Sequence, residues 1–214
     1  MKNQKNIIIL FFTLIVIMLG FGMVIPILPF YVDSFGASGS AMGALMAAYA
    51  IMQLIFAPIW GDMSDRFGRK PIIMIGVLGN VISQLLFGFS TQLWMLFAAR
   101  ILAGILSSAT LPTAMAFISD STSHKNRSGG MGIVGAAMGI GMVLGPGVAG
   151  WLANISLATP FFLASALSAI AFVLVWAILP ESLPKEKRIQ SDKKLHGPER
   201  SEERRVGKEC RSRW

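Results

Sequence analysis

Residues 61–70 read Gly-Asp-Met-Ser-Asp-Arg-Phe-Gly-Arg-Lys, a strongly charged stretch that separates two long apolar runs. Its three cations and two carboxylates require water, whereas the runs on either side require an apolar environment. The two glycines, Gly61 and Gly68, predict a tight reversal of the chain, because glycine adopts backbone conformations that other residues avoid. The stretch therefore predicts two membrane-spanning helices joined by a charged turn at the membrane surface.

The overall composition also places the chain in a lipid bilayer. Hydrophobic residues make up 54% of the 214 residues and charged residues only 14%, and the mean hydropathy is +0.62. Soluble domains carry about 25% charged residues. The net charge of +8 comes from connecting loops and from the segment after residue 180, so it gives no reason to expect a nucleic-acid partner.

Hydropathy divides the chain into six spans of about 20 residues, the length needed to cross about 30 Å of hydrocarbon. The predicted spans are residues 7–30, 41–60, 71–89, 93–119, 129–153 and 160–179. Outside the spans, Lys and Arg precede the first span and follow the second, fourth and sixth, and the other connections contain none. By the positive-inside rule, both ends of the chain are therefore expected in the cytoplasm.

A weak internal repeat relates the first three spans to the last three. Pro26 and Pro112 are 86 residues apart, and two further proline pairs, Pro58 with Pro146 and Pro71 with Pro160, are 88 and 89 residues apart. Because each unit has three spans, the second unit is inverted relative to the first. The predicted fold class is an all-α integral membrane protein with six transmembrane helices arranged as a 3+3 inverted repeat.

Two segments divide the chain by composition. Residues 1–185 contain the six spans, and residues 186–214 form a charge-dense tail without apolar periodicity. Such a composition predicts disorder. Non-native read-through sequence and a natural cytoplasmic linker both remain open as explanations of this tail.

The pattern in residues 61–70 resembles the loop between transmembrane helices 2 and 3 of the major facilitator superfamily, and it agrees at six positions of ten. The resemblance covers about residues 5–185, the N-terminal half of a 12-helix transporter, and implies a missing C-terminal half. It implies that Arg69 pairs with Asp120 at the end of the fourth span and that Asp65 points toward the second half. The implied cytoplasmic gate motif comprises Gly61, Asp65, Arg66, Gly68, Arg69, Lys70 and Asp120.

Arg100 is the one ionisable residue clearly inside a predicted span, so we expect it to face a cavity. Residues 96–104 read Leu-Phe-Ala-Ala-Arg-Ile-Leu-Ala-Gly and resemble the helix-4 motif of proton-coupled family members, which implies a role for Arg100 in proton coupling. The alternative is that Arg100 reaches the outer membrane surface. Asp33, at the end of the first span, is either a second proton-coupling residue or a solvated helix-end residue.

The fifth span carries a glycine pattern that narrows the class of transporter. Gly132, Gly141, Gly145, Pro146 and Gly150 resemble the helix-5 motif of drug/proton antiporters. Four small residues at spacings of four form a ridge on this span. In the family such a ridge is expected to pack against helices of the second half, so here we expect it to have no packing partner. The four residues are Ala137, Gly141, Gly145 and Ala149. Ordinary helix packing is the alternative.

Adaptable side chains in the spans predict a wall for amphipathic drugs, because methionine and aromatic groups adjust to varied shapes. The predicted substrate pocket comprises Phe21, Met46, Tyr49, Gln53, Met138 and Met142. Each of these residues has ordinary packing as its alternative role.

These features predict a secondary active transporter that exports small amphipathic drugs by proton antiport, present as a half, in a bacterial inner or plasma membrane. A solute or sugar carrier on the same fold and a non-transporting six-helix membrane protein that dimerises are the alternatives. No enzyme signature accompanies the spans. The two histidines, His124 and His196, are isolated and Cys210 is the single cysteine, so neither a metal site nor a cofactor is expected.

Overall fold

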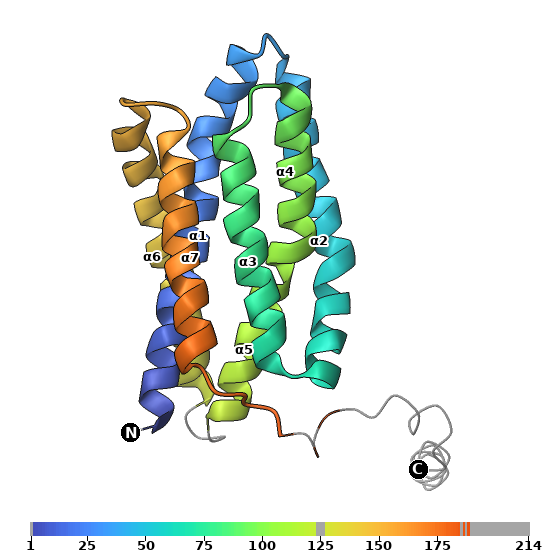
Figure 1. Ribbon diagram of the computed structural model, residues 1–214, viewed down its shortest axis with the longest axis vertical. Coiled ribbons are helices and arrows are strands. Elements are labelled where there is room, and N and C mark those ends of the chain that lie inside the picture. The colour runs from blue at the N-terminus through green and yellow to red at the C-terminus, as the bar shows by residue number, and fades with distance from the viewer. Residues whose placement is uncertain (1, 123–126, 185, 187, 189–214) are drawn as a thin grey trace, which may run out of the picture.

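The computed structural model describes residues 2–122, 127–184, 186 and 188, and within these residues the chain is helical, without strands. The helices run up and down along one long axis (Figure 1). The elements in order are α1 (Lys2–Ser34), α2 (Gly39–Phe67), α3 (Arg69–Gly88), α4 (Leu93–Leu106), the 3₁₀ turn η1 (Ser107–Ala109), α5 (Thr110–Ser121), α6 (Arg127–Ala153) and α7 (Thr159–Ile178). In the part of the chain that the structure describes, six helical segments are long and apolar enough to cross a membrane, with α4, η1 and α5 forming one of them. The predicted tail, residues 186–214, lies outside the described residues apart from 186 and 188.

Within the described residues, the six membrane-length segments form two groups of three that meet along α3 and α7 (Figure 1). In one group α1 packs against α6 and α7, and in the other α4 packs against α2 and α3. Exchanging α1 with α4, α2 with α6 and α3 with α7 reproduces this pattern of neighbours. Asn80 Nδ2 donates to Ser168 Oγ at 2.9 Å across the α3–α7 contact, and these residues are 88 positions apart, close to the spacing of the proline pairs. The arrangement agrees with the predicted 3+3 inverted repeat.

The fourth span is interrupted where the sequence predicted one continuous helix. Pro112 has no backbone N–H and its ring crowds the preceding turn, so the helix tightens into η1 one turn earlier. At this break the carbonyl oxygen of Ile105 accepts hydrogen bonds from Trp60 Nε1 at 2.6 Å and from Ser108 Oγ at 2.8 Å. The indole of α2 therefore satisfies a backbone group at the break.

The turn within residues 61–70 is shorter than predicted. Gly61 lies inside α2, which continues to Phe67, and only Gly68 leaves the helical conformation, with φ +112° and ψ 161°. Asp62 and Arg66, four residues apart on the last turns of α2, form an ion pair at 2.8 Å, and such pairs support a helix in water. The reversal therefore rests on Gly68 alone, and the predicted role of Gly61 in it is wrong.

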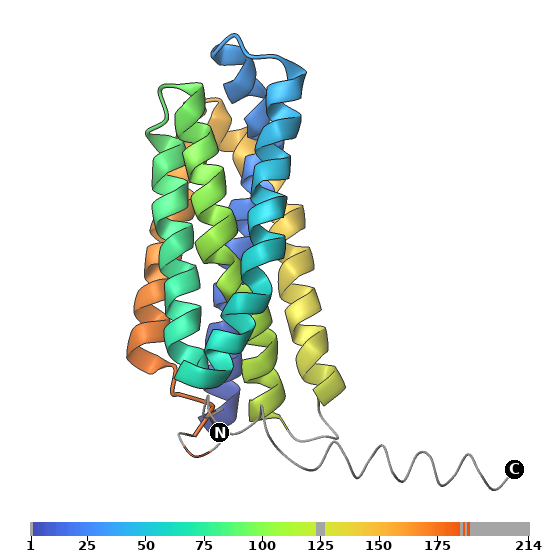
Figure 2. The ribbon, with the colours of Figure 1, turned by 90° about the vertical axis from the view of Figure 1, so that its right-hand side faces the viewer.

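One end of the bundle collects the charged connections. The start of α1, the α2–α3 turn, the end of α5 and the start of α6 all lie at this end (Figure 2). Two apolar clusters fill the interior, one nearer this end with Leu14 and Ile17 and one nearer the other end with Val24 and Phe87. All four residues also border a cavity between the clusters.

Candidate functional site

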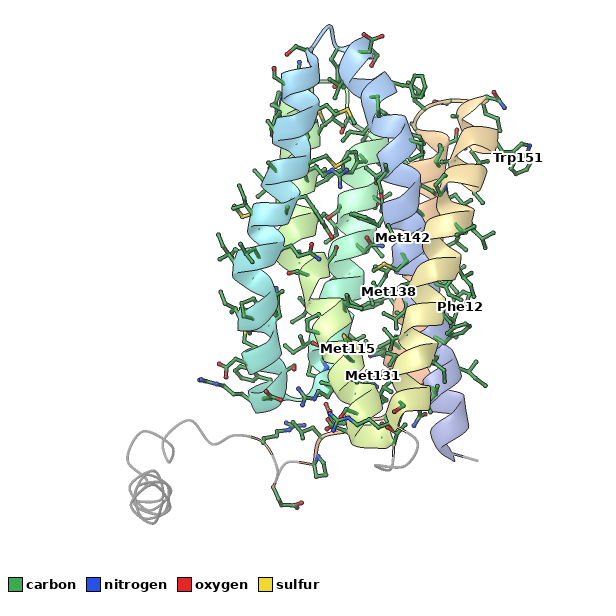
Figure 3. All side chains as sticks on the ribbon, turned by 180° about the vertical axis from the view of Figure 1, so that it is seen from behind. Phe12, Met115, Met131, Met138, Met142 and Trp151 are labelled. Atoms are coloured by element: carbon green, nitrogen blue, oxygen red, sulfur yellow. The ribbon has the colours of Figure 1, made fainter. Side chains whose placement is uncertain are left out.

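The centre of the bundle contains a cavity of about 240 Å³ with walls from α1 to α6. Five of the six predicted pocket residues line it, namely Phe21, Tyr49, Gln53, Met138 and Met142. Figure 3 shows Met138 and Met142 on the side of α6 that faces α5 and α2, whereas Trp151 points away from the bundle. The sixth, Met46, does not line the cavity, and its sulfur lies 3.4 Å from Arg100 Nη2.

Arg100 lies in the middle of α4 and borders this cavity with only 1% of its surface exposed. Its guanidinium carbon lies 5.5 Å from the ring centroids of both Tyr49 and Phe87. Its Nε has no hydrogen-bond partner, and among the described residues that line the cavity none is Asp or Glu. Insertion of an arginine at the centre of a membrane helix costs about 2.5–3.5 kcal/mol. Arg100 therefore does not reach the surface, and its charge lies in the interior without a carboxylate.

Three more polar groups face the cavity and have no hydrogen-bond partner among the described residues. They are Gln84 Oε1 on α3, Ser107 Oγ in η1 and Thr110 Oγ1 at the start of α5. Buried polar groups in proteins are nearly always hydrogen-bonded. The two hydroxyl groups near the break, the Gln84 amide of α3 and the Arg100 guanidinium of α4 therefore all border one cavity. The sequence analysis did not single out Gln84, Ser107 or Thr110, although the proline after η1 signals a helix distortion in an otherwise apolar span.

Asp33 lies apart from this arrangement. Its side chain is exposed near the end of α1, and it does not line the cavity. The structure thus does not bring together the two residues predicted for proton coupling. That joint role remains a prediction.

At the charged end, one arginine ties the α2–α3 turn to α5. Arg69 Nε donates to Asp120 Oδ2 at 3.1 Å, while its Nη1 lies 2.6 Å from both Asp65 Oδ1 and Ser64 Oγ. We call Ser64, Asp65, Arg69 and Asp120 the latch. The predicted contact between Arg69 and Asp120 is confirmed. The predicted orientation of Asp65 is wrong, because a carboxylate four residues before Arg69 lies within reach of its guanidinium.

Glu181 supports the latch from the segment that follows α7. Its Oε1 accepts from the backbone N–H of Arg69 at 2.8 Å, and its Oε2 accepts from that of Lys70 at 3.3 Å. A carboxylate at a helix N-terminus satisfies free amide groups and the helix dipole. Lys70 Nζ in turn donates to the carbonyl of Trp176 at 2.8 Å. The sequence analysis did not use Glu181, but an acidic residue directly after the sixth span, on the same side as the start of α3, is a usable signal.

A family model described as Major Facilitator Superfamily matches residues 10–213. The chain belongs to the major facilitator superfamily. It is 43% identical over 190 residues to multidrug resistance protein 2 of Bacillus subtilis, a match that covers 88% of this chain and 48% of that protein. It is 41% identical over 176 residues to the class B tetracycline resistance protein of Escherichia coli, covering 81% of this chain and 43% of the relative.

Two more matches extend the comparison. The quinolone resistance protein NorA of Staphylococcus aureus is 32% identical over 192 residues, covering 90% of this chain and 49% of that protein. The crystal structure of the human organic anion transporter MFSD10 (TETRAN) superposes with a TM-score of 0.77 at 25% identity, covering 87% of this chain and 50% of that chain. The chain therefore spans about half the length of these major facilitator proteins, consistent with an N-terminal half.

In this major facilitator fold the small-residue ridge of α6 packs inside the chain itself. A Cβ atom added at Gly145 would lie 2.8 Å from Gly22 Cα on α1, and one added at Gly141 would lie 2.8 Å from the carbonyl oxygen of Ile15. The ridge is buried, so the expectation that it stays unmatched is wrong. Small residues on both helices let the backbones of α1 and α6 approach closely. Of the other predicted motif positions, Gly132, Pro146 and Gly150 are exposed on the opposite side of α6.

Proposed function

We propose that this chain forms the N-terminal half of a bacterial drug exporter driven by proton antiport. The observation that carries the proposal is a buried arginine at the wall of a cavity lined with aromatic and methionine side chains. The names of the relatives support export of multiple drugs, tetracycline or quinolones. The substrate is then a small amphipathic drug, and the coupling ion is a proton.

The proposed proton coupling depends on the charge of Arg100. A fixed positive charge in an apolar interior favours the ionised form of a nearby carboxylate. The attraction between the two groups is therefore lost when that carboxylate takes up a proton. The carboxylate belongs to the C-terminal half in this proposal, because the described spans place none beside Arg100. Asp33 contributes at the outer mouth, where protons enter.

Alternating access requires the charged end to open and close. In the proposal, Arg69 holds α2, α3 and α5 together in one state and releases them in the other, with the latch acting as a gate. Arg66 and Lys70 complete the motif at the cytoplasmic surface. Asp65 and Asp120 are partly exposed, so water can replace Arg69 at both carboxylates when the contact breaks during a transport cycle.

The missing half is proposed to cover the outer face of α2 and α6. Leu54 on α2 is 77% exposed and Val143 on α6 is 76% exposed, so both present apolar surface to lipid or to another helix. Gly132 and Gly150 lie on the exposed side of α6, where a second half can approach closely. The remaining perimeter contacts the bilayer, with both ends of the chain in the cytoplasm.

The orientation is tested by placing single cysteines within residues 61–70 and 121–128 of a Cys210→Ser background. They should resist membrane-impermeant thiol reagents applied to intact cells, and should react after permeabilisation. Labelling from outside would reverse the assigned topology.

Transport is tested by drug accumulation in cells that express residues 1–214, alone or with a separately expressed C-terminal half of a close relative. We expect efflux only with both halves, and we expect a protonophore to abolish it. Protonophore-sensitive efflux by the chain alone, with no full-length partner found by crosslinking, would contradict the half-transporter proposal. Sizing of the purified chain then tests whether a homodimer forms.

A further inference from the structure

We propose that Met46, Tyr49 and Phe87, which we call the clamp, are positioning residues that hold the Arg100 guanidinium in place for proton coupling. The purpose of the clamp rests on the proposed function, whereas the clamp itself can be tested without transport. The proposal gives Tyr49 and Phe87 a role beyond lining the cavity, and gives Met46 a role outside drug binding.

Among the described residues, the polar and aromatic contacts of the guanidinium come from the clamp. The Cζ atom of Arg100 lies over the rings of Tyr49 on α2 and Phe87 on α3, at 5.5 Å from each centroid. The sulfur of Met46 lies 3.4 Å from Nη2. The face of an aromatic ring attracts a cation most strongly where water is excluded, and only 1% of the Arg100 surface is exposed. Two helices therefore hold the charge from two rings.

These contacts fix the position of the charge without neutralising it. A thioether is a weak acceptor and an aromatic ring has no net charge, so both interact with a guanidinium less strongly than a carboxylate does. An ionised carboxylate of the second half can therefore compete with the clamp for Arg100. When that carboxylate takes up a proton, the guanidinium still has the clamp. A side chain that is already fixed also loses less conformational entropy when it pairs.

The clamp matches an arginine better than a lysine. A guanidinium is planar and delocalised and stacks on aromatic faces, whereas an ammonium group is compact and strongly hydrated. Met46 and Tyr49 are three residues apart on α2, so they lie on the same side of that helix. One side of α2 therefore supplies two of the three clamp residues, and α3 supplies the third.

Both rings of the clamp have further aromatic neighbours that restrict their movement. The ring of Tyr49 lies 5.5 Å from that of Phe21 on α1. The ring of Phe87 stacks on that of Phe161 on α7, with a centroid distance of 5.2 Å and an interplanar angle of 23°. Phe87 is 2% exposed and Phe161 is fully buried. The position of Arg100 is therefore linked to four helices besides its own.

A double-mutant cycle measures the clamp in the purified 214-residue chain, without transport. Tyr49→Leu removes a ring, and Arg100→Leu removes the charge without introducing a sulfur or a ring. In mild detergent, Tyr49→Leu should lower the thermal denaturation midpoint by about 4–8 °C more when Arg100 is present than in the Arg100→Leu background. Phe87→Leu should show the same dependence on Arg100. Tyr49→Phe preserves the ring face and should lower the midpoint alike in both backgrounds.

Phe117 provides the matched control for this cycle. It is 1% exposed, so it is buried as deeply as Phe87, but it belongs to the apolar cluster nearer the charged end. Phe117→Leu should lower the midpoint equally in the Arg100 and Arg100→Leu backgrounds. Additive effects of both Tyr49→Leu and Phe87→Leu with Arg100→Leu would overturn the clamp.

A spectroscopic measurement keeps the proposal open to refutation if the leucine variants at the rings do not fold. In a chain labelled with [¹⁵N]arginine, the Nε–Hε resonance of Arg100 is assigned by its loss in Arg100→Leu or Arg100→Lys. Protons over ring faces are shielded, so this resonance should lie upfield of those from exposed arginines. Tyr49→Phe should leave it upfield. A resonance among those of the exposed arginines would overturn the clamp.

The positioning role is tested in cells that co-express the chain with the C-terminal half of a relative. Met46→Leu removes the thioether outside the cavity and should lower the maximal rate of drug efflux per folded protein by about 2- to 5-fold. The drug concentration at half-maximal rate should not change. Met142→Leu, the same exchange on the cavity wall, should instead change that concentration.

The outcomes separate the clamp from the proposed function. An unchanged maximal rate in Met46→Leu would overturn the positioning role, whether or not the half-maximal concentration changes. If the unmodified halves export no drug while the cycle is non-additive, the proposed export function is refuted and the clamp stands as the group that holds Arg100.

Discussion

Two arginines in this chain occupy opposite electrostatic situations. Arg69, at the charged end, has two carboxylates and a hydroxyl within 3.1 Å of its guanidinium. Arg100, in the middle of α4, is almost fully buried and its closest described polar contact is a thioether. The arginine side chain therefore completes a network of ion pairs and hydrogen bonds at the charged end. In the middle of α4 the same side chain has no such network around it.

The difference separates stability from function. A charge whose partners lie within the chain contributes to the folded structure, and its removal leaves those partners unpaired. A buried charge without a partner destabilises the structure and persists where a ligand or a reaction requires it. We therefore expect substitutions at the two arginines to change stability in opposite directions.

The first prediction compares Arg100→Met with Arg69→Met. Arg100→Met should raise the free energy of unfolding by about 2–3 kcal/mol, because an apolar side chain replaces an unpaired charge inside the bundle. Arg69→Met should lower it by about 1.5–3 kcal/mol, because Asp65 and Asp120 lose a charged hydrogen-bond donor. Thermal denaturation in mild detergent, followed by size-exclusion chromatography, measures both.

The sign of each shift decides the comparison. In proteins of 150–250 residues, 1 kcal/mol shifts the denaturation midpoint by about 2–4 °C, so both effects are measurable. If Arg100→Met lowers the midpoint as much as Arg69→Met does, Arg100 has structural partners of equal value and the contrast between the regions fails.

The second prediction concerns the turn that carries the latch. Gly68→Ala should destabilise the chain by about 1–3 kcal/mol, because φ +112° with ψ 161° is a region open almost only to glycine. An added Cβ atom would also collide with the carboxylate of Glu181. The matched control is Gly61→Ala, at a helical position with open space around it, which should be neutral or stabilising by up to about 1 kcal/mol. Equal effects at the two glycines would contradict the assignment of the reversal to Gly68.

The sequence was sufficient for the architecture because the bilayer imposes the strongest constraint. Span length, the placement of Lys and Arg and the proline pairs predicted six helices and their inverted relation. The break in the fourth span was not predicted, because a proline in a membrane helix is often tolerated and its effect depends on partners such as Trp60, 45 residues away from the Ile105 carbonyl. Tertiary context decided that local structure.

The site was predicted in its residue types and less well in its contacts. Arg100 and five of the six pocket residues were found from apolar context and side-chain chemistry. The unpartnered groups of Gln84, Ser107 and Thr110 could not be found in this way, because a polar residue in a span usually has a hydrogen-bond partner and only coordinates show its absence. The partner of the α6 ridge was assigned wrongly, because a small-residue spacing shows that a helix approaches closely and does not identify which helix.

The third prediction tests whether Glu181 supports the latch through the start of α3. Glu181→Gln should lower the free energy of unfolding by about 0.3–1 kcal/mol, because a neutral amide interacts less favourably with the helix N-terminus. The loss should shrink as salt is raised, since ions screen a partly exposed charge. Asp33→Asn provides the matched control, because it removes an exposed carboxylate near the end of α1, far from the charged end of the bundle. It should cause a smaller change in the free energy of unfolding. A loss in Glu181→Gln that does not depend on salt would indicate a packing effect in place of an electrostatic one.

The fourth prediction concerns the exposed ion pair of α2, for which we expect the smallest contribution to stability. Asp62 Oδ2 lies 2.8 Å from Arg66 Nη2, closer than the 3.1 Å contact between Asp120 and Arg69, yet both of its side chains are substantially exposed, at 53% and 43%. Water competes for exposed charges, and pairs four residues apart on a helix contribute only about 0.3–0.5 kcal/mol.

Asp62→Asn should therefore change the free energy of unfolding by less than about 0.5 kcal/mol. Asp120→Asn should lower it by at least about 1 kcal/mol, because Arg69 is 91% buried and cannot replace its partner with water. Both substitutions remove one carboxylate and preserve side-chain size, so denaturation midpoints compare burial directly. If Asp62→Asn proves as costly as Asp120→Asn, separation between the charged atoms governs these contacts more than burial does, and the argument that assigns different roles to Arg69 and Arg100 loses its physical basis.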